Sequence, residues 1–600
     1  MDDSKINSDI FLECNWGDIA STLSESYDYQ RADIISAQLG KSESPEKKRV
    51  CILLQKVFSM RLKPESINAP FEPLFINYET QKRTAIIDDF SNNELEFLYE
   101  ILVHIEDPWS EARLNDILWL CHKPRNPDFA RVAISSYISS YISSDISSLK
   151  WIQEQEKEWE RAARLCLQLR EIDQLSVIIS RVVSEIRNDS DDSKFMALRL
   201  AKFLLKLKIA SDHYQHIAEI LTTNAVSLKQ EKDFYSSRAY YELAEKMYDI
   251  VGDKELWVKC LVNCAEVYEL DGDERNIDSH MGANSSYERA LQAYRKVPKK
   301  YRIEYGIDEI LKRLQQKLTI SGQETIDNMG TFALPPIDIK DIAEKAISHV
   351  SGKPDPQLAL LYFVGVNQIS EYSKLESDAK EMLSQFSFRS LIGSTQMSND
   401  GRVVAKSPSI PLNSNASDNA LAVYNQMLSN FNLGLQFTCD AAILPSLNRI
   451  VQEFRITRDF LEAVCFHSPI VPSDRVKLVA SALWFGFEYE FGIAIHLICP
   501  QVEHMIRVKL KNNGESTSTV DPNGIETENG LSSLMDNPKI DEIFGKDLAF
   551  ELRAVFTESL GSNLRNEAAH GLLSDDSTNS YAAIYAWWLS LRLVLHAMVK

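Results

Sequence analysis

One short segment near the C-terminus combines side chains that could carry out chemistry on a phosphate. It reads Arg565-Asn566-Glu-Ala-Ala-His570-Gly571. A histidine can take or give a proton near neutral pH, and an arginine can hold a phosphate through two parallel hydrogen bonds. An amide can fix the tautomer of an imidazole. Together, these groups are suited to metal-free cleavage of RNA, in which a base activates the ribose 2′-hydroxyl against the adjacent phosphate.

The spacing of these residues predicts how a helix would place them. Asn566 and His570 are four residues apart, so they share a helix face and Asn566 could orient the imidazole. Arg565 and His570 are separated by about 140° on an ideal helix, so we expect them to flank a cleft. Gly571 is predicted to end the helix and leave His570 near an edge. The competing interpretation is a capping network, in which Arg565 pairs with an acid and His570 caps the helix end.

An upstream helix adds two charged residues that could extend this site. Glu503 and Arg507 are four residues apart and lie on one helix face. The alternative, which we favour, is that Glu503 and Arg507 form a purely structural ion pair. The preceding apolar helix is predicted to end near Cys499, just before a proline. The neighbouring His504 is interpreted as a packed or surface histidine.

The region from about Pro472 to Ser574 resembles a known family, named domain of unknown function 4209. Its hallmark RNxxxHG stands here as Arg565, Asn566, His570 and Gly571, and the flanking HLICPQVEHMIR and DPNGIETENGLSSLM agree with it. The segment ARLNDILWLC resembles the helical region that accompanies this domain in longer members. That family is in turn similar to the HEPN superfamily of four-helix domains, many of which are dimeric endoribonucleases.

The resemblance implies roles for the residues of the motif. His570 would act as base or acid, Arg565 would bind phosphate, and Asn566 would support both. Glu503, Arg507 and Gly571 would be supporting residues. The resemblance also implies a homodimer, with RNA (tRNA is one candidate) as the substrate. Leu572 stands where HEPN toxins silenced by nucleotidyl transfer carry a tyrosine, which disfavours that form of regulation.

Periodicity and composition predict an all-α protein. Glycine and proline are scarce, 21 and 20 in 600 residues, and apolar residues recur at helical spacing almost throughout. We expect a tetratricopeptide-like (TPR-like) helical solenoid followed by a HEPN-like helical bundle. The predicted divisions are residues 1–185 (N-terminal helical region), 186–330 (TPR-like hairpins), 331–470 (helical linker region with a polar loop at 392–419) and 471–600 (HEPN-like domain).

The TPR-like assignment comes from two segments that combine small and large apolar residues at helical spacing. AYYELAEKMYDIVGD and KCLVNCAEVYELDGD are each predicted to end in a Gly-Asp turn. Such hairpins must stack on their neighbours to bury their apolar faces, and their surfaces often bind peptides. We therefore expect a protein partner on the helical array. A polar insert at residues 511–530 interrupts the last domain.

Net charge and the make-up of the apolar stretches argue against a nucleic-acid coat and a membrane protein. A net charge of −21 argues against a protein that coats DNA or anionic membrane over its whole surface. The apolar stretches Val479–Cys499 and Ala582–Val599 contain charged residues, so we interpret them as core helices and expect no membrane span. Trp587 and Trp588 are interpreted as packing residues rather than as a base-stacking surface.

Nine scattered cysteines fit a reducing cytoplasm, and the polar, acidic N-terminus does not resemble a signal peptide. Cys260 and Cys264 have no second Cys or His pair nearby, so we expect no metal and no cofactor. The leading hypothesis is a metal-independent HEPN-type endoribonuclease, serving as a defence or stress effector with the helical array as sensor. The alternative is a non-catalytic scaffold that dimerises through the C-terminal domain. A nucleotide-binding regulator is disfavoured because no Gly-rich phosphate loop is present.

Overall fold

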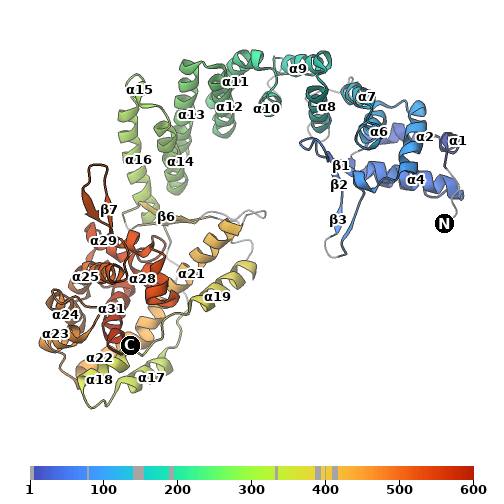
Figure 1. Cartoon of the computed structure of the whole chain (residues 1–600). Coiled ribbons are helices and arrows are strands. Elements are labelled where there is room, and N and C mark those ends of the chain that lie inside the picture. Colours follow the sequence, from blue (N-terminus) through green and yellow to red (C-terminus); the bar gives the residue numbers. More distant parts are fainter. Residues whose placement is uncertain are drawn as a thin grey trace. The chain divides into compact units, whose positions relative to one another are not determined.

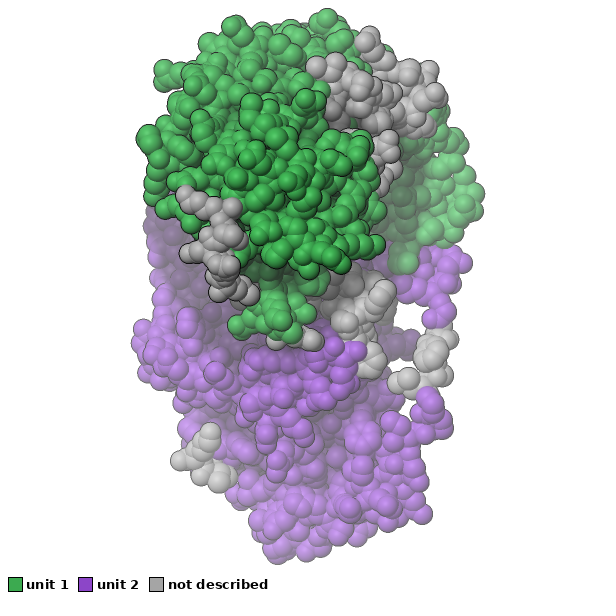
Figure 2. Space-filling view, turned by 90° about the vertical axis from the view of Figure 1, so that its right-hand side faces the viewer, with its two compact units in different colours: residues 1–318 green, residues 319–600 purple. Residues whose placement is uncertain are grey.

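The computed structural model describes residues 6–26, 28–77, 80–139, 155–187, 195–330, 335–385, 393–398, 400–407 and 416–599. The chain divides into two compact units, unit 1 (Met1–Leu318) and unit 2 (Thr319–Lys600), shown in green and purple in Figure 2. The prediction of an all-α protein is confirmed, because helices dominate both units and the described strands form four two-stranded antiparallel pairs. The solenoid, the HEPN-like bundle and the four domain ranges stay predictions.

Unit 1 is built almost entirely from helices, with two small hairpins near its start. Its helices are α1 (Ser8–Leu12), α2 (Trp16–Glu25), α3 (Asp28–Leu39), α4 (Pro45–Phe58), α5 (Asn92–Ile101), α6 (Pro108–Cys121), α7 (Pro127–Ser139), α8 (Glu156–Leu169), α9 (Ile172–Arg187), α10 (Met196–Leu207), α11 (Tyr214–Gln230), α12 (Phe234–Val251), α13 (Lys254–Arg275), α14 (His280–Arg295), α15 (Lys299–Arg302) and the first part of α16 (Ile307–Asp327). The hairpins pair β1 (Met60–Leu62) with β2 (Phe71–Pro73) and β3 (Ile76–Asn77) with β4 (Lys82–Arg83).

From α6 to α14, helices pack mainly against their neighbours along the chain, except that α10 packs on α9 and α12 more than on α11 (Figure 1). A buried ion pair joins three of them: Arg161 on α8 donates two hydrogen bonds to Asp116 on α6, at 2.9 and 2.8 Å, and Tyr137 on α7 donates a third at 3.1 Å. Because Arg161 and Asp116 are almost fully buried, this two-point contact fixes the packing of α6, α7 and α8.

The two predicted Gly-Asp turns have different outcomes. The first is confirmed: α12 ends at Gly252, whose φ of +89° suits glycine, and the side chain of Asp253 caps α13 by accepting from the Leu256 amide at 3.1 Å. The second is wrong, since Gly272 lies inside α13. A Cβ there would lie 2.4 Å from the ring of Tyr287 on α14, so Gly272 permits close helix packing instead of a turn.

Unit 2 holds the remaining helices and two further hairpins. Its helices, after the end of α16, are α17 (Lys340–Val350), α18 (Pro356–Phe363), α19 (Tyr372–Gln385), α21 (Ala416–Thr438), α22 (Leu444–Glu453), α23 (Arg458–His467), α24 (Val476–Phe487), α25 (Phe491–Asn512), α26 (Leu531–Met535), α27 (Lys539–Phe544), α28 (Lys546–Phe556), α29 (Leu564–Ala569), α30 (Asp575–Thr578) and α31 (Tyr581–Val599). A single hydrophobic core joins α24, α25, α28 and α31 with helices from α17 onward.

The polar stretch 392–419 was predicted to be a loop, and this is wrong for most of its described residues; residues 392, 399 and 408–415 lie outside the described part of the chain. It contains the antiparallel pair β5 (Ser394–Met397) and β6 (Val403–Ser407), and α21 begins at Ala416. Gly401, in the turn of this hairpin, has a φ of +79°, and a Cβ there would lie 2.3 Å from the backbone of Gly322 on α16. The hairpin is therefore packed closely on that helix. The sequence does not reveal this hairpin because its strands are only four and five residues long and are mostly exposed or half-buried, so they show no clear alternation of apolar and polar residues.

The last helix, α31, runs through the core of unit 2. Trp587 and Trp588 are fully buried, and their indole nitrogens donate to the carbonyl oxygens of Leu483 and Phe363 at 2.9 and 3.1 Å. Their interpretation as packing residues is confirmed. Within the described residues, no helix combines the length and the apolar character needed to cross a membrane.

We expect Gly486→Ala to destabilise unit 2. Gly486 lies in α24, and a Cβ there would lie 2.0 Å from Nε1 of Trp587. The substitution forces the indole or the helix to move, which we expect to lower the free energy of unfolding by about 1–3 kcal/mol. Urea denaturation followed by tryptophan fluorescence measures this loss.

The matched control for this substitution is Gly434→Ala, in the exposed part of α21. No atom lies within 4 Å of a Cβ placed there, so helix propensity alone predicts a gain of up to about 1 kcal/mol. Equal effects of the two substitutions would contradict the packing role of Gly486.

Candidate functional site

The site is built on α25, which is longer than the sequence predicts. A helix end near Cys499 was expected because Pro500 follows it, but α25 continues through Pro500 to Asn512. Proline removes one backbone hydrogen bond, and here the buried residues on both sides, including Cys499 and Val502, keep the helix packed in the core. Glu503 and Arg507 therefore belong to the same continuous helix as the buried residues before Pro500.

The predicted motif residues lie on and just after α29, a helix of six residues. Asn563 precedes the helix with a φ of +48°, and Gly571 follows it with a φ of +66°. The amides of Gly571 and Leu572 donate to the carbonyl oxygens of Ala568 and Glu567, at 3.3 and 2.9 Å. This Schellman arrangement ends the helix where the sequence indicates and leaves His570 at its C-cap, exposed to solvent.

Arg565 is held by hydrogen bonds from two of its three nitrogens. Its Nε donates to Oε2 of Glu503 at 2.7 Å, and its Nη1 donates to Oδ1 of Asn566 at 3.3 Å. In the described part of the chain, no residue accepts a hydrogen bond from Nη2, and the side chain is 25% exposed. A Cβ at Gly530 would lie 3.3 Å from Nη2, so a glycine there leaves room for the guanidinium group.

Glu503 joins three segments through one carboxylate. Besides Arg565, it accepts from Arg507 at 2.7 Å and from the backbone amide of Leu531 at 3.2 Å. Burial raises the pKa of this carboxyl, but the hydrogen bonds from Arg507 and Arg565 outweigh that effect, and the pKa is lowered overall. Glu503 is therefore ionised at neutral pH and pairs with both arginines.

The polar insert 511–530 is part of the same cluster of charges. It folds into a hairpin of β7 (Ser518–Val520) and β8 (Glu526–Glu528), drawn beside α29 in Figure 1. Arg507 donates to the carbonyl oxygen of Asn529 at 2.7 Å and lies 3.2 Å from the carboxylate of Glu528, which also pairs with Lys511. Three cations thus face two carboxylates, and the cluster is locally positive within an acidic chain.

The expected contact between Asn566 and the imidazole of His570 is not formed. The amide nitrogen of Asn566 instead donates to Oδ1 of Asn563 at 2.7 Å. Asn563 takes the left-handed conformation at the start of α29 and so lies within reach of that amide. No described residue hydrogen-bonds the imidazole of His570, which remains open to solvent at the helix end.

The structure therefore brings Arg565, Asn566, Glu503 and Arg507 into one hydrogen-bonded cluster, with His570 and Gly571 at its edge. Sequence analysis missed four members, Lys511, Glu528, Asn529 and Asn563. Lys511, Glu528 and Asn529 lie in the polar insert 511–530, and only the left-handed preference of asparagine could have pointed to the role of Asn563.

The cluster offers no evident metal site. Among the residues that the structure describes, no three His, Cys, Asp or Glu side chains lie close enough together to hold a metal ion. Cys499 lies in the core near Arg565 and Glu503, and burial raises the pKa of its thiol to about 12, so it is no nucleophile at neutral pH.

Comparison with known proteins adds information on unit 1. Residues 1–178 match the model of a family described as a domain of unknown function (DUF7380). This match covers less than a third of the chain and ends before unit 2 begins, so it does not concern the cluster around Glu503. No curated protein matches the sequence. The function must therefore be argued from the chemistry of the cluster.

We expect Glu503→Gln to loosen the contact between α25 and α29. A neutral amide cannot pair with two guanidinium groups, and we expect a loss of about 1–3 kcal/mol at pH 7. Because the folded-state pKa is lowered, the carboxylate stabilises the fold above its ordinary value of 4.5, and this stabilisation disappears as the pH falls through the lowered pKa. The difference between wild type and variant should therefore shrink in acid.

Hydrogen exchange of peptides covering α25 and α29, followed by mass spectrometry between pH 7 and pH 3 with the intrinsic rate corrected, measures this effect. Glu488→Gln is the control, since Glu488 is an exposed glutamate at the end of α24. Protection that is equally reduced in both variants, or a difference that grows in acid, would contradict the role of Glu503.

Proposed function

We propose that this protein is a metal-independent endoribonuclease of HEPN type. The observation that carries the proposal is the position of Arg565: Glu503 accepts from its Nε, Nη2 has no acceptor among the described residues, and the side chain is 25% exposed. The same six-residue helix ends at His570, whose imidazole is exposed. A group that binds phosphate and a group that transfers protons thus lie on one short, open element.

In the proposed reaction, His570 takes the proton of a ribose 2′-hydroxyl. The 2′-oxygen then forms a bond to the adjacent phosphorus, and the bond from phosphorus to the 5′-oxygen breaks. The leaving oxygen takes up a proton from an imidazolium or from water, which gives a 2′,3′-cyclic phosphate and a 5′-hydroxyl. Arg565 would stabilise the negative charge on the phosphoryl oxygens, an effect that charge-assisted hydrogen bonds strengthen.

Two features shape the proposed substrate and assembly. Acidic residues outnumber basic ones in the chain, so a long RNA backbone would be repelled outside the locally positive cluster. We therefore infer a small or structured RNA, such as tRNA, or delivery by a protein partner on the helices of unit 1. We also infer a homodimer that brings two copies of Arg565 and His570 together, and a cytoplasmic role as a defence or stress effector.

The second candidate is a non-catalytic scaffold that dimerises through unit 2. It is favoured by the ion pairs of Glu503 with Arg507 and Arg565, which are the contacts that the capping interpretation expects. In that case, the cluster only fastens α29 and the β7–β8 hairpin to α25, and RNA would be unaffected.

His570→Ala separates the two candidates. We expect the purified wild type to cleave tRNA or total RNA without added metal, in the presence of a chelator, and the variant to be slower by about 10²–10⁴-fold. Product ends are read by whether a phosphatase that opens cyclic phosphates changes gel mobility. In cells, overproduction of the wild type should slow growth and that of the variant should not.

His467→Ala is the matched control, because His467 is an exposed histidine at the end of α23, outside the cluster. It should behave as the wild type does. Equal RNA cleavage by wild type and His570→Ala, or no cleavage by either together with normal growth, would overturn the endoribonuclease and leave the scaffold.

A further inference from the structure

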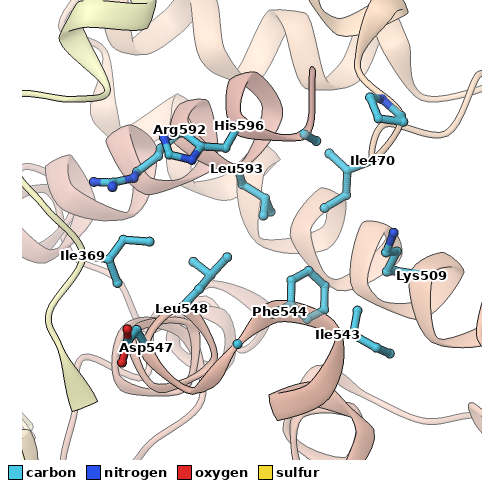
Figure 3. A pocket seen from close by; sticks show the side chains of 13 residues that line it. Ile369, Ile470, Lys509, Ile543, Phe544, Asp547, Leu548, Arg592, Leu593 and His596 are labelled. Carbon is cyan, nitrogen blue, oxygen red and sulfur yellow. The ribbon is translucent and has the colours of Figure 1, made fainter. Parts of the chain in front are cut away.

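Unit 2 contains a second candidate site, a cavity of about 460 Å³. Its volume falls within the range of about 300–1,000 Å³ that is typical of small-molecule sites. The lining comes from α27 and the start of α28, the ends of α25 and α31, the loop after α23 and the segment between α18 and α19. Figure 3 shows the apolar side chains that face its centre: Ile369, Ile470, Phe544, Leu548 and Leu593.

One wall of the cavity is held in place by hydrogen bonds. The segment from Asn367 to Tyr372 contains the lining residue Ile369. Nη1 of Arg592 donates to the carbonyl oxygen of Asn367 at 2.5 Å, and the amide of Tyr372 donates to Asp547 at 2.8 Å. Between them, the amide of Ser370 donates to the buried carboxyl of Glu551 at 2.7 Å. The cavity is therefore largely formed before any ligand binds.

Arg592, which lines this cavity, is a buried cation whose charge is only partly compensated, by Glu551 and by the Trp588 ring 5.3 Å away. Its side chain is 8% exposed, and its Nε is buried without a hydrogen-bond acceptor among the described residues. Its electrostatic partner among the described carboxyls is Glu551, which accepts no hydrogen bond from it. Burial lowers the pKa of Arg592, and the nearby Glu551 and Tyr585 offset only part of that effect. A buried cation without a paired anion is costly, so an anion at this end of the cavity would be stabilising.

The other charged lining residues also favour an anion. Lys509 on α25 is exposed, and none of the described residues pairs with its ammonium group. His596 lies one turn after Arg592 on α31, and Figure 3 shows both on the same side of the cavity. The acid in the lining, Asp547, already accepts from the amide of Tyr372. Two cations, Arg592 and Lys509, and one acid, Asp547, therefore line a centre that is apolar.

We propose that this cavity binds a small amphipathic carboxylate, with an aliphatic body against Ile369, Leu548 and Leu593 and its head group on Arg592. A carboxylate matches the planar edge of a guanidinium, and an apolar body of this size fills the centre without leaving polar groups unpaired. A medium-chain fatty acid has this chemistry. The site is separate from the cluster around Glu503 and does not depend on the proposed RNA cleavage.

The probe for this site is sodium decanoate at submicellar concentration, titrated into the full chain at pH 7 by isothermal calorimetry. We expect saturable binding of one molecule per chain and a rise in the unfolding temperature. Decanol tests the need for the charge, and decyltrimethylammonium tests its sign. Both should bind at least ten-fold more weakly than decanoate.

Two variants localise the binding. Arg592→Gln removes the charge and should weaken decanoate binding by about ten- to hundred-fold. Leu548→Trp fills the cavity and should abolish binding while leaving Arg592 in place, which keeps the test valid if Arg592→Gln does not fold. Lys509→Gln should weaken binding less, because Lys509 is exposed. The control is Lys546→Gln, an exposed lysine of α28 outside the lining, which should bind as the wild type does.

Absence of saturable decanoate binding would overturn the proposal. Binding that survives Leu548→Trp would also overturn it, since that result indicates association with the surface, as would equal binding of decanoate and decyltrimethylammonium.

Discussion

The carboxylate of Glu503 is the contact on which the organisation of the candidate site depends. It lies on α25, yet it binds a residue of α29, a second residue of α25 and the amide that begins α26. Removing an ionised carboxylate from water is costly, and here two guanidinium groups and one amide compensate for that cost. Without this acid, Arg565 and Arg507 would be left as neighbouring like charges, and the short helix α29 would lose its attachment through Arg565. A helix of six residues such as α29 has little stability of its own.

The same ion pair explains why structural and chemical interpretations of Arg565 are compatible. Glu503 accepts from Nε and so sets the plane of the guanidinium, while Nη2 has no hydrogen-bond acceptor among the described residues. A carboxylate that positions an arginine also lowers its net charge, and the extra cations of Arg507 and Lys511 restore a positive balance. The β7–β8 hairpin, formed by a polar insert, supplies Glu528, whose carboxylate pairs with Arg507 and Lys511, so the hairpin is part of the site.

Helix α25 serves two regions of unit 2 at once. Glu503 and Arg507 share one face and point toward α29, whereas Lys509 follows Glu503 by about 240° around the helix and lines the cavity that also contains Arg592. Because a packed helix moves as a rigid element, α25 links the cavity, which Lys509 lines, to the charged cluster around Glu503. The continuation of α25 past Pro500 is what makes this arrangement available.

Much of this protein follows from local rules, and the sequence by itself determined those parts. Helical periodicity specified an all-α chain, the Gly252–Asp253 pair specified a turn, and Gly571 specified the end of α29, because each acts over a few neighbouring residues. Only the tertiary structure decided the rest. Gly272 accommodates Tyr287 of the next helix, and Arg565 binds an acid 62 residues away, while Asn566 turns to Asn563 and leaves His570 uncovered. Such contacts depend on where distant helices lie when the core is packed, which no short window of sequence specifies.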